Sequence, residues 1–175
     1  SETNPIPWES CMPMSTSWSY VPDARNKSAN TLIHMLCNAV SKGGNFLLNV
    51  APGPDGDWDD SSYFRLKEIG AWMKVNSDAI YGTTFIKPYK EGRFVFTKKG
   101  STVFAIYLAE EGETRMPATI RISSFPKTKS TKIRLLGYDK PLSLEKTDAA
   151  ISVVVPEKLR TNPPAQHAWV FSIED

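Results

Sequence analysis

The sequence predicts an α/β domain followed by an all-β domain. Strand-like and helix-like segments alternate up to about residue 84, and this βαβα order is typical of a parallel sheet. The segment Phe-Leu-Leu-Asn-Val at 46–50 is apolar without strict alternation, as expected for a strand covered on both faces. After residue 84, short β-type segments follow one another with turn residues between them, which is typical of an antiparallel sandwich. We therefore predict two domains, 1–84 and 85–175.

Length and composition exclude several classes of protein. The chain has 175 residues, 41% of them hydrophobic, which is enough for a buried core. The net charge of +2 comes from scattered basic and acidic residues, so nucleic-acid binding is not expected. No apolar run approaches the roughly 20 residues that span a bilayer, and the first residues do not resemble a signal peptide. The two cysteines show no metal-ligand spacing and no nucleotide-binding motif is present, so we expect neither metal nor cofactor.

The first predicted unit is a short strand followed by a helix. Trp8–Met12 is the strand, and a loop rich in Ser, Pro, Asp and Asn follows it. The helix is expected over Ser28–Lys42, because its apolar residues recur at i, i+3, i+4, i+7 and i+11. Ser28 is a suitable N-cap, and Gly43 can adopt the left-handed conformation that ends a helix.

The second predicted unit is the strand at 46–50 and a helix over Ser62–Val75. Asp59 and Asp60 precede this helix, where the helix dipole favours negative charge. The inner face of the helix is expected to contain Leu66, Ile69, Gly70 and Met73. Two βα units are only a quarter of a (β/α)8 barrel, which typically needs about 250 residues. We therefore expect a preceding portion of the barrel to lie outside this chain.

The second part of the chain is predicted to contain seven short strands. Strict alternation at 101–107 and 119–122 indicates strands with one solvent-exposed face and one buried face. The expected strands are Phe94–Thr97, Val103–Tyr107, Thr119–Ile122, Lys132–Leu135, Leu142–Leu144, Ala150–Val154 and Trp169–Ser172.

Five motifs of the first part resemble, in order, the final barrel segments of α-L-fucosidases of glycoside hydrolase family 29. They are WESCM at 8–12, SWSY at 17–20, SKGGNFLLNV at 41–50, PDG at 54–56 and AIYGT at 79–83. The resemblance implies that 1–84 forms the last two βα units of an incomplete (β/α)8 barrel, followed by the family's C-terminal β-sandwich. It also implies a secreted, periplasmic or lysosomal location, which the sequence itself does not indicate.

The resemblance further implies a retaining glycosidase acting on fucosylated glycans. Retention needs two carboxyl groups about 5–5.5 Å apart, one as nucleophile and one as general acid/base. The family's nucleophile is an Asp on an earlier barrel strand, and no segment of this chain corresponds to it. The missing N-terminal barrel portion would supply this Asp, so we expect the 175-residue chain alone to be inactive.

Glu9 is the candidate general acid/base. It follows Trp8 at the start of a short apolar strand, and a carboxyl group next to an indole is expected to have a pKa raised by desolvation. The alternative interpretation is a surface glutamate at a strand end.

Trp18, Tyr20 and Trp58 are the candidate sugar-binding residues. Trp18 and Tyr20 lie in the loop after the first strand, and Trp58 lies in the turn after the second. Fucose has an apolar face that stacks on aromatic rings, so aromatic residues at a barrel mouth suit it. The alternative is that these rings only pack their own loops.

Two functions without catalysis remain as alternatives to the enzyme. The chain could be a carbohydrate-binding or structural β-sandwich module, which would be favoured if the sandwich exposed a row of aromatic side chains. Its aromatic residues alternate in ways that suit a core instead. The chain could also be a structural fragment with no activity of its own.

Overall fold

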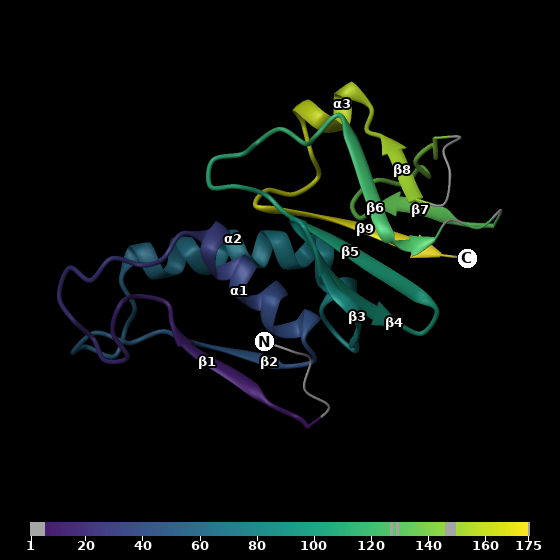
Figure 1. Cartoon of the computed structure of the whole chain (residues 1–175). Helices are drawn as coiled ribbons and strands as arrows, with labels where there is room; N and C mark the ends of the chain where they lie inside the picture. Colours follow the sequence, from purple (N-terminus) through teal and green to yellow (C-terminus); the bar gives the residue numbers. More distant parts are fainter. Residues whose placement is uncertain (1–5, 127, 129, 146–149, 175) are drawn as a thin grey trace.

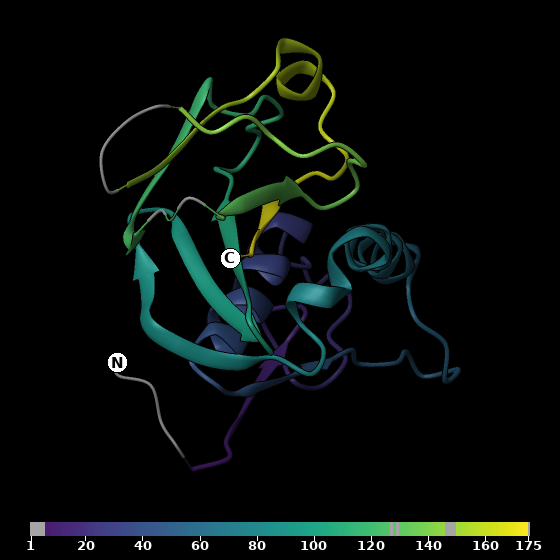
Figure 2. The same ribbon diagram turned by 90° about the vertical axis from the view of Figure 1, so that its right-hand side faces the viewer.

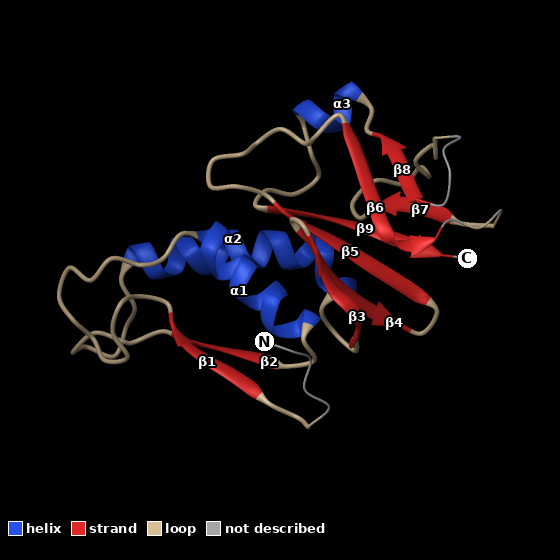
Figure 3. Cartoon of the chain, viewed as in Figure 1, coloured by secondary structure: helices blue, strands red, loops and turns tan. Residues whose placement is uncertain are grey.

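The computed structural model describes residues 6–126, 128, 130–145 and 150–174, which form successive layers. A parallel pair of strands lies on one side of two helices, and a five-stranded antiparallel sheet lies on their other side (Figure 1). A second antiparallel pair and a short helix cover the far face of the large sheet (Figure 3). Figure 2 shows the green and yellow C-terminal strands on the opposite side of the molecule from the purple N-terminal strand.

The N-terminal part contains the predicted parallel βαβ unit. Strand β1 (Glu9–Pro13) and strand β2 (Asn45–Asn49) pair in parallel, with Glu9 opposite Asn45. Helix α1 (Ala29–Ser41) connects them and packs on β2. Because the strands are parallel, their carboxyl ends meet at one edge of the pair.

Both ends of α1 follow the sequence prediction. The Ser28 hydroxyl accepts a hydrogen bond of 3.1 Å from the backbone N–H of Thr31, which satisfies one of the free donors of the first turn. Gly43 has a φ of +82°, the left-handed conformation that ends a helix at low steric cost.

Helix α2 (Asp60–Asn76) is longer than predicted and is anchored by a residue that the periodicity did not indicate. Asp59 caps it, since its side chain accepts a 2.8 Å hydrogen bond from the Ser62 N–H. Trp72 is the buried anchor, only 2% exposed, and its indole N–H donates a 2.9 Å hydrogen bond to the Ala168 carbonyl. Gly70, predicted on the inner face, is exposed. The short 3-10 helix η1 (Ser77–Ala79) follows α2.

The five-stranded sheet has the order β3-β4-β5-β9-β7 and is antiparallel throughout. Its strands are β3 (Thr84–Glu91), β4 (Phe94–Lys99), β5 (Thr102–Leu108), β9 (Ala168–Glu174) and β7 (Lys132–Leu135). The second pair consists of β6 (Thr119–Pro126) and β8 (Ala150–Val154), and α3 (Glu157–Thr161) follows β8.

Two hydrophobic clusters lie on the two faces of the large sheet. On one face Ile33 and Cys37 of α1 and Trp72 of α2 pack with Val95 and Ile106 of the sheet. On the other face the strands pack against β6, β8 and α3. The prediction of one solvent-exposed face is therefore wrong for β5, where Phe104 through Tyr107 are all buried. It is confirmed for β6, in which Ile120 and Ile122 are buried and Arg121 is exposed.

Two strand predictions were wrong. Leu142–Leu144 forms no strand; Leu144 makes only an isolated bridge with Val153. β3 was not predicted because it contains Pro88, which removes a ladder donor, and its register shifts between Phe85 and Lys90. Pairing with the buried strand β4 stabilises this edge strand despite its weak local pattern.

Candidate functional site

The loops that follow β1 and β2 are joined at the carboxyl ends of these strands. The Asn49 side-chain amide donates a 2.9 Å hydrogen bond to the Trp18 carbonyl, and the Met14 N–H donates a 2.8 Å bond to the Asn49 carbonyl. Farther along the first loop, the Asn26 amide donates to the Ser61 hydroxyl at 2.7 Å. These bonds hold the first loop against the end of β2 and the start of α2. We call the exposed part of the two loops the loop surface.

The three predicted sugar-binding aromatics belong to this surface. Trp18 is 54%, Tyr20 43% and Trp58 39% exposed, so none of them is merely a core residue. Large apolar side chains that stay exposed in this way often mark a binding surface when they gather. The two loops follow the carboxyl ends of the parallel strands, the end at which parallel α/β folds place their sites. A role of the three rings in sugar binding stays a prediction.

Tyr63, which the sequence reasoning did not identify, forms a ring contact with Trp58. Their ring centroids are 5.6 Å apart and the planes are tilted by 57°. The Tyr63 hydroxyl donates a 2.5 Å hydrogen bond to the Asp57 carboxylate, which also accepts a 2.8 Å bond from the Trp58 N–H. The bond from Tyr63, followed by that from Trp58, lowers the pKa of Asp57. Tyr63 could have been identified from the sequence, because it is an aromatic residue in the first turn of the predicted helix that lies away from the helix's apolar stripe.

Glu9 lies at the other end of β1, away from these loops. The strand rises about 13 Å from its first to its fifth residue, since each residue of a strand advances about 3.3 Å. Glu9 is exposed, and one of its carboxylate oxygens accepts a 3.3 Å hydrogen bond from the Cys11 thiol. The Trp8 indole packs against Gly44, just before the neighbouring strand β2. The burial that the sequence reasoning expected for Glu9 is therefore not observed.

A cavity of about 570 Å³ lies beside the parallel pair rather than at the loops. Its apolar lining comes from both helices and β2, and includes Leu36, Val40, Phe46, Leu48 and Met73. The helix side chains Leu36, Val40 and Met73 are only partly buried although they belong to the inner cluster.

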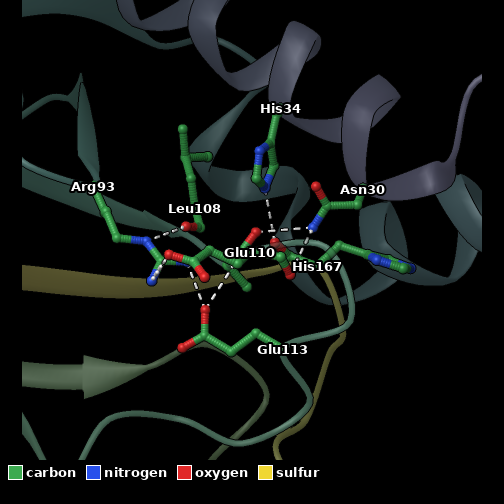
Figure 4. Close-up of polar contacts among 8 residues, drawn as sticks. Asn30, His34, Arg93, Leu108, Glu110, Glu113 and His167 are labelled. Carbon is green, nitrogen blue, oxygen red and sulfur yellow. Dashed lines mark hydrogen bonds and ion pairs between the residues drawn. The ribbon is translucent and has the colours of Figure 1, made fainter.

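A polar cluster connects α1 with the large sheet (Figure 4). The buried Asn30 amide donates a 2.9 Å hydrogen bond to the Ala109 carbonyl, and His34 Nε2 lies 3.0 Å from the His167 carbonyl. Burial lowers the pKa of both His34 and His167, which favours neutral imidazoles. Arg93 completes the cluster through ion pairs to the loop that follows β5. Because these groups bond one another, the cluster serves to join the layers.

Within residues 6–126, 128, 130–145 and 150–174, no group of three or more His, Cys, Asp or Glu side chains could hold a metal ion. No helix in that part of the chain has the length and apolar character needed to cross a membrane.

Family models match nearly the whole chain. Residues 1–78 match the model described as α-L-fucosidase, and residues 89–174 match that of the α-L-fucosidase C-terminal domain. Among curated relatives, bovine tissue α-L-fucosidase is 33% identical over 177 residues, covering 95% of this chain and 36% of the relative. An α-L-fucosidase from Branchiostoma floridae is 30% identical, covering 95% of this chain and 38% of the relative.

Solved structures give the same relationship. Thermotoga maritima α-fucosidase superposes with a TM-score of 0.84 at 26% identity, covering 100% of this chain and 42% of that one. Isoenzyme 1 from Paenibacillus thiaminolyticus superposes with a TM-score of 0.82 at 27% identity, covering 97% and 40%. The chain thus spans about two fifths of the length of these relatives. It belongs to the α-L-fucosidase family, and it corresponds to the C-terminal part of that family's polypeptides.

Proposed function

We propose that the whole polypeptide is a retaining α-L-fucosidase that releases terminal fucose from glycans. The observation that carries this proposal is the exposed aromatic surface at the carboxyl ends of β1 and β2, in a chain of this family. Active sites of (β/α)8 barrels lie at that end of the strands. The T. maritima relative has been crystallised with fucose and with a mechanism-based inhibitor.

The same proposal assigns 1–84 to the last two βα units of a (β/α)8 barrel and 85–175 to the C-terminal sandwich. The parallel pair supports this assignment. Leu47, an apolar residue on the face of the pair that no helix covers, is 43% exposed. In a closed barrel that face would line the interior, and the pair would gain neighbouring strands. A preceding barrel segment would also cover the apolar cavity beside α2.

Trp18, Tyr20 and Trp58 are proposed to contact the fucosylated glycan, with Trp18 and Tyr20 at the fucose itself. The methyl group and C–H face of fucose are apolar, and they can pack on a ring whose other face rests on protein. The hydrogen bond from Asn49 to the Trp18 carbonyl would hold the first loop in place as the sugar binds. Such positioning before binding reduces the entropy that association costs.

Glu9 is the proposed general acid/base, with the nucleophilic Asp supplied from outside this chain. The geometry supports this role less than it supports the sugar contacts. Glu9 lies at the amino end of β1, whereas barrel enzymes carry their reacting groups at the carboxyl ends. A fucose bound among the loop aromatics would be a strand's length away, so the leaving-group dependence of a Glu9→Gln variant decides the assignment.

The sandwich gives no support to the alternative of a carbohydrate-binding module. Its aromatics Phe94, Phe96, Tyr107, Trp169 and Phe171 are each at most 8% exposed. They form the core, in which Phe94 and Tyr107 make an edge contact at 5.2 Å. No row of exposed rings is present on the described strands of the sandwich.

The proposal is tested by comparing the whole polypeptide with the 175-residue chain. We expect the whole polypeptide to hydrolyse an aryl α-L-fucoside with retention, so that the first sugar product detected by NMR is the α-anomer. The 175-residue chain should show no turnover. Absence of activity in the folded whole polypeptide, or a first-formed β-anomer, would contradict the proposal. So would turnover by the short chain that a Glu9→Gln substitution abolishes.

A further inference from the structure

Trp58 and Tyr63 form an exposed aromatic pair where the loop after β2 meets α2. They are 39% and 41% exposed, and they lie before and within the first turn of α2. Trp18 and Tyr20 come from the other loop, after β1. We propose that the Trp58–Tyr63 pair is a subsite for the sugar residue that carries the fucose, which rests on the α-L-fucosidase function proposed above.

The pair is held in position by Asp57. The Asp57 carboxylate accepts hydrogen bonds from the Tyr63 hydroxyl at 2.5 Å and from the Trp58 N–H at 2.8 Å. The Asp55 carboxylate in turn accepts a 3.2 Å bond from the Asp57 N–H. These bonds set the tilt of 57° between the rings while both remain open to solvent. Rings positioned in this way lose little conformational entropy when a ligand binds.

The chemistry of the pair suits a hexopyranose of the galactose type. The hydrogens on C3, C4 and C5 of such a sugar form an apolar face that packs on an aromatic ring. A carboxylate has about four lone-pair positions, and Asp57 uses two for protein donors. The remaining positions can accept hydroxyl groups at the edge of the same sugar. A purely apolar ligand would gain nothing from this carboxylate.

The position of the pair places it beside, rather than at, the proposed fucose contacts. In a (β/α)8 barrel the helices form a ring outside the strands, so residues at the start of α2 lie farther from the barrel axis than the strand ends. A sugar linked to the anomeric oxygen of a bound fucose extends away from the fucose pocket. The start of α2 is thus a suitable place for the second sugar.

The test compares two substrates of the whole polypeptide that differ only in the leaving group. α-L-Fucosyl fluoride has no second sugar, whereas fucosyl-α-1,2-galactose has one. We expect Trp58→Ala and Tyr63→Ala to lower kcat/KM for the disaccharide about three- to tenfold, the usual worth of one aromatic contact. Activity on the fluoride should stay within about twofold of the parent.

Phe64→Ala is the matched control. Phe64 is the next residue of the same helix, is 57% exposed and contacts Arg65, but is not part of the pair. It should leave both substrates unaffected. Tyr63→Phe keeps the ring and removes the hydrogen bond to Asp57, so it should give a smaller loss on the disaccharide than Tyr63→Ala.

The other possible results distinguish failure of the subsite from failure of the proposed function. An equal loss on both substrates would overturn the subsite, because the pair would then contact the fucose itself. Unchanged disaccharide hydrolysis in both alanine variants would also overturn it. A folded parent polypeptide that hydrolyses neither substrate would instead refute the proposed function, a result that differs from either of these.

Discussion

The Trp8 indole packs directly against the backbone of Gly44, just before the neighbouring strand β2. A Cβ atom added at Gly44 would lie 2.4 Å from two ring carbons of Trp8, well inside van der Waals contact. The Trp8 carbonyl also accepts a 2.9 Å hydrogen bond from the Asn45 N–H at the start of β2. The glycine therefore allows the two strands of the parallel pair to begin side by side.

We expect Gly44→Ala to destabilise the protein by about 1–3 kcal/mol, since the bulky indole must move or change rotamer. Urea unfolding followed by tryptophan fluorescence measures the change. Gly70→Ala is the control: Gly70 is helical, has no atom within 4 Å of its added Cβ, and should gain about 0.5–1 kcal/mol. Equal stability of Gly44→Ala and the parent would show that the contact does not constrain the strand.

Glu9→Gln in the whole polypeptide tests the general-acid role. A lost acid should slow the cleavage of poor leaving groups by roughly 10²–10⁴-fold, whereas activated aryl fucosides, which need little protonation, should lose far less. Steady-state rates over a series of aryl leaving groups measure this difference. Glu174→Gln, at the exposed end of β9, is the control. Equal losses for all leaving groups would assign Glu9 a structural role at the base of β1.

Stability should decrease as the pH falls below about 6.5, the ordinary pKa of histidine. Burial lowers the pKa of His34 and His167 in the folded state, so the unfolded chain binds protons more readily. The contribution is complete above the unfolded pKa and is lost as the pH falls towards the folded one. The negative charges of Glu68 and Glu111 raise the pKa of His167 and so reduce this loss of stability. The positive charge of Arg93 lowers the pKa of His34 and so increases it.

Melting temperatures between pH 7.5 and 5 measure this effect. His34→Gln, which keeps a donor facing the His167 carbonyl, should flatten the profile. An unchanged slope in that variant would show that His34 does not contribute to the acid sensitivity.

Glu91→Ala should cost about 1–2 kcal/mol of stability at neutral pH, because hydrogen bonds to a charged group are stronger than neutral ones. Its carboxylate accepts bonds from the Ser123 N–H at 2.9 Å and from the Ser124 N–H at 2.8 Å, joining β3 to β6. Burial raises the pKa of Glu91, but the bonds from Ser124 and Ser123 outweigh burial and hold that pKa below its ordinary value.

The contribution of Glu91 is present above the ordinary glutamate pKa and is lost as the pH falls through the folded value. Chemical denaturation at pH 7 and pH 3 measures it. The parent and Glu91→Ala should differ less at pH 3. Glu174→Ala is the control, because it removes a strand-end carboxylate that is exposed instead of half-buried. A difference that is independent of pH would point to lost packing instead of lost hydrogen bonds.

The elements with strong local patterns were predictable from the sequence. α1 has a full apolar stripe, a Ser28 cap and a Gly43 stop, and both ends were found within one residue. β3 was not predictable from the sequence. Pro88 and the register shift interrupt its strand pattern, so it is defined by its pairing with β4. The burial of both faces of β5 was also not predictable from the sequence, because it depends on helices that are far away along the chain.

The candidate site shows the same division. The loop aromatics Trp18, Tyr20 and Trp58 could be proposed from the sequence, because aromatic residues that follow predicted parallel strands are a local signal, and their role in sugar binding stays a prediction. The contact between Trp58 and Tyr63, and its support by Asp57, depends on how the loop after β2 meets α2. Trp8 does not bury Glu9 as expected, because its indole packs instead against Gly44, across the parallel pair.

The sequence by itself determined the family, the order of elements and the residue types at the strand ends, because motifs and periodicity are properties of the chain. Only the tertiary structure decided which side chains meet. It placed the aromatic pair at one end of the parallel strands and Glu9 at the other, because an extended strand separates its two ends by a distance that no side chain spans.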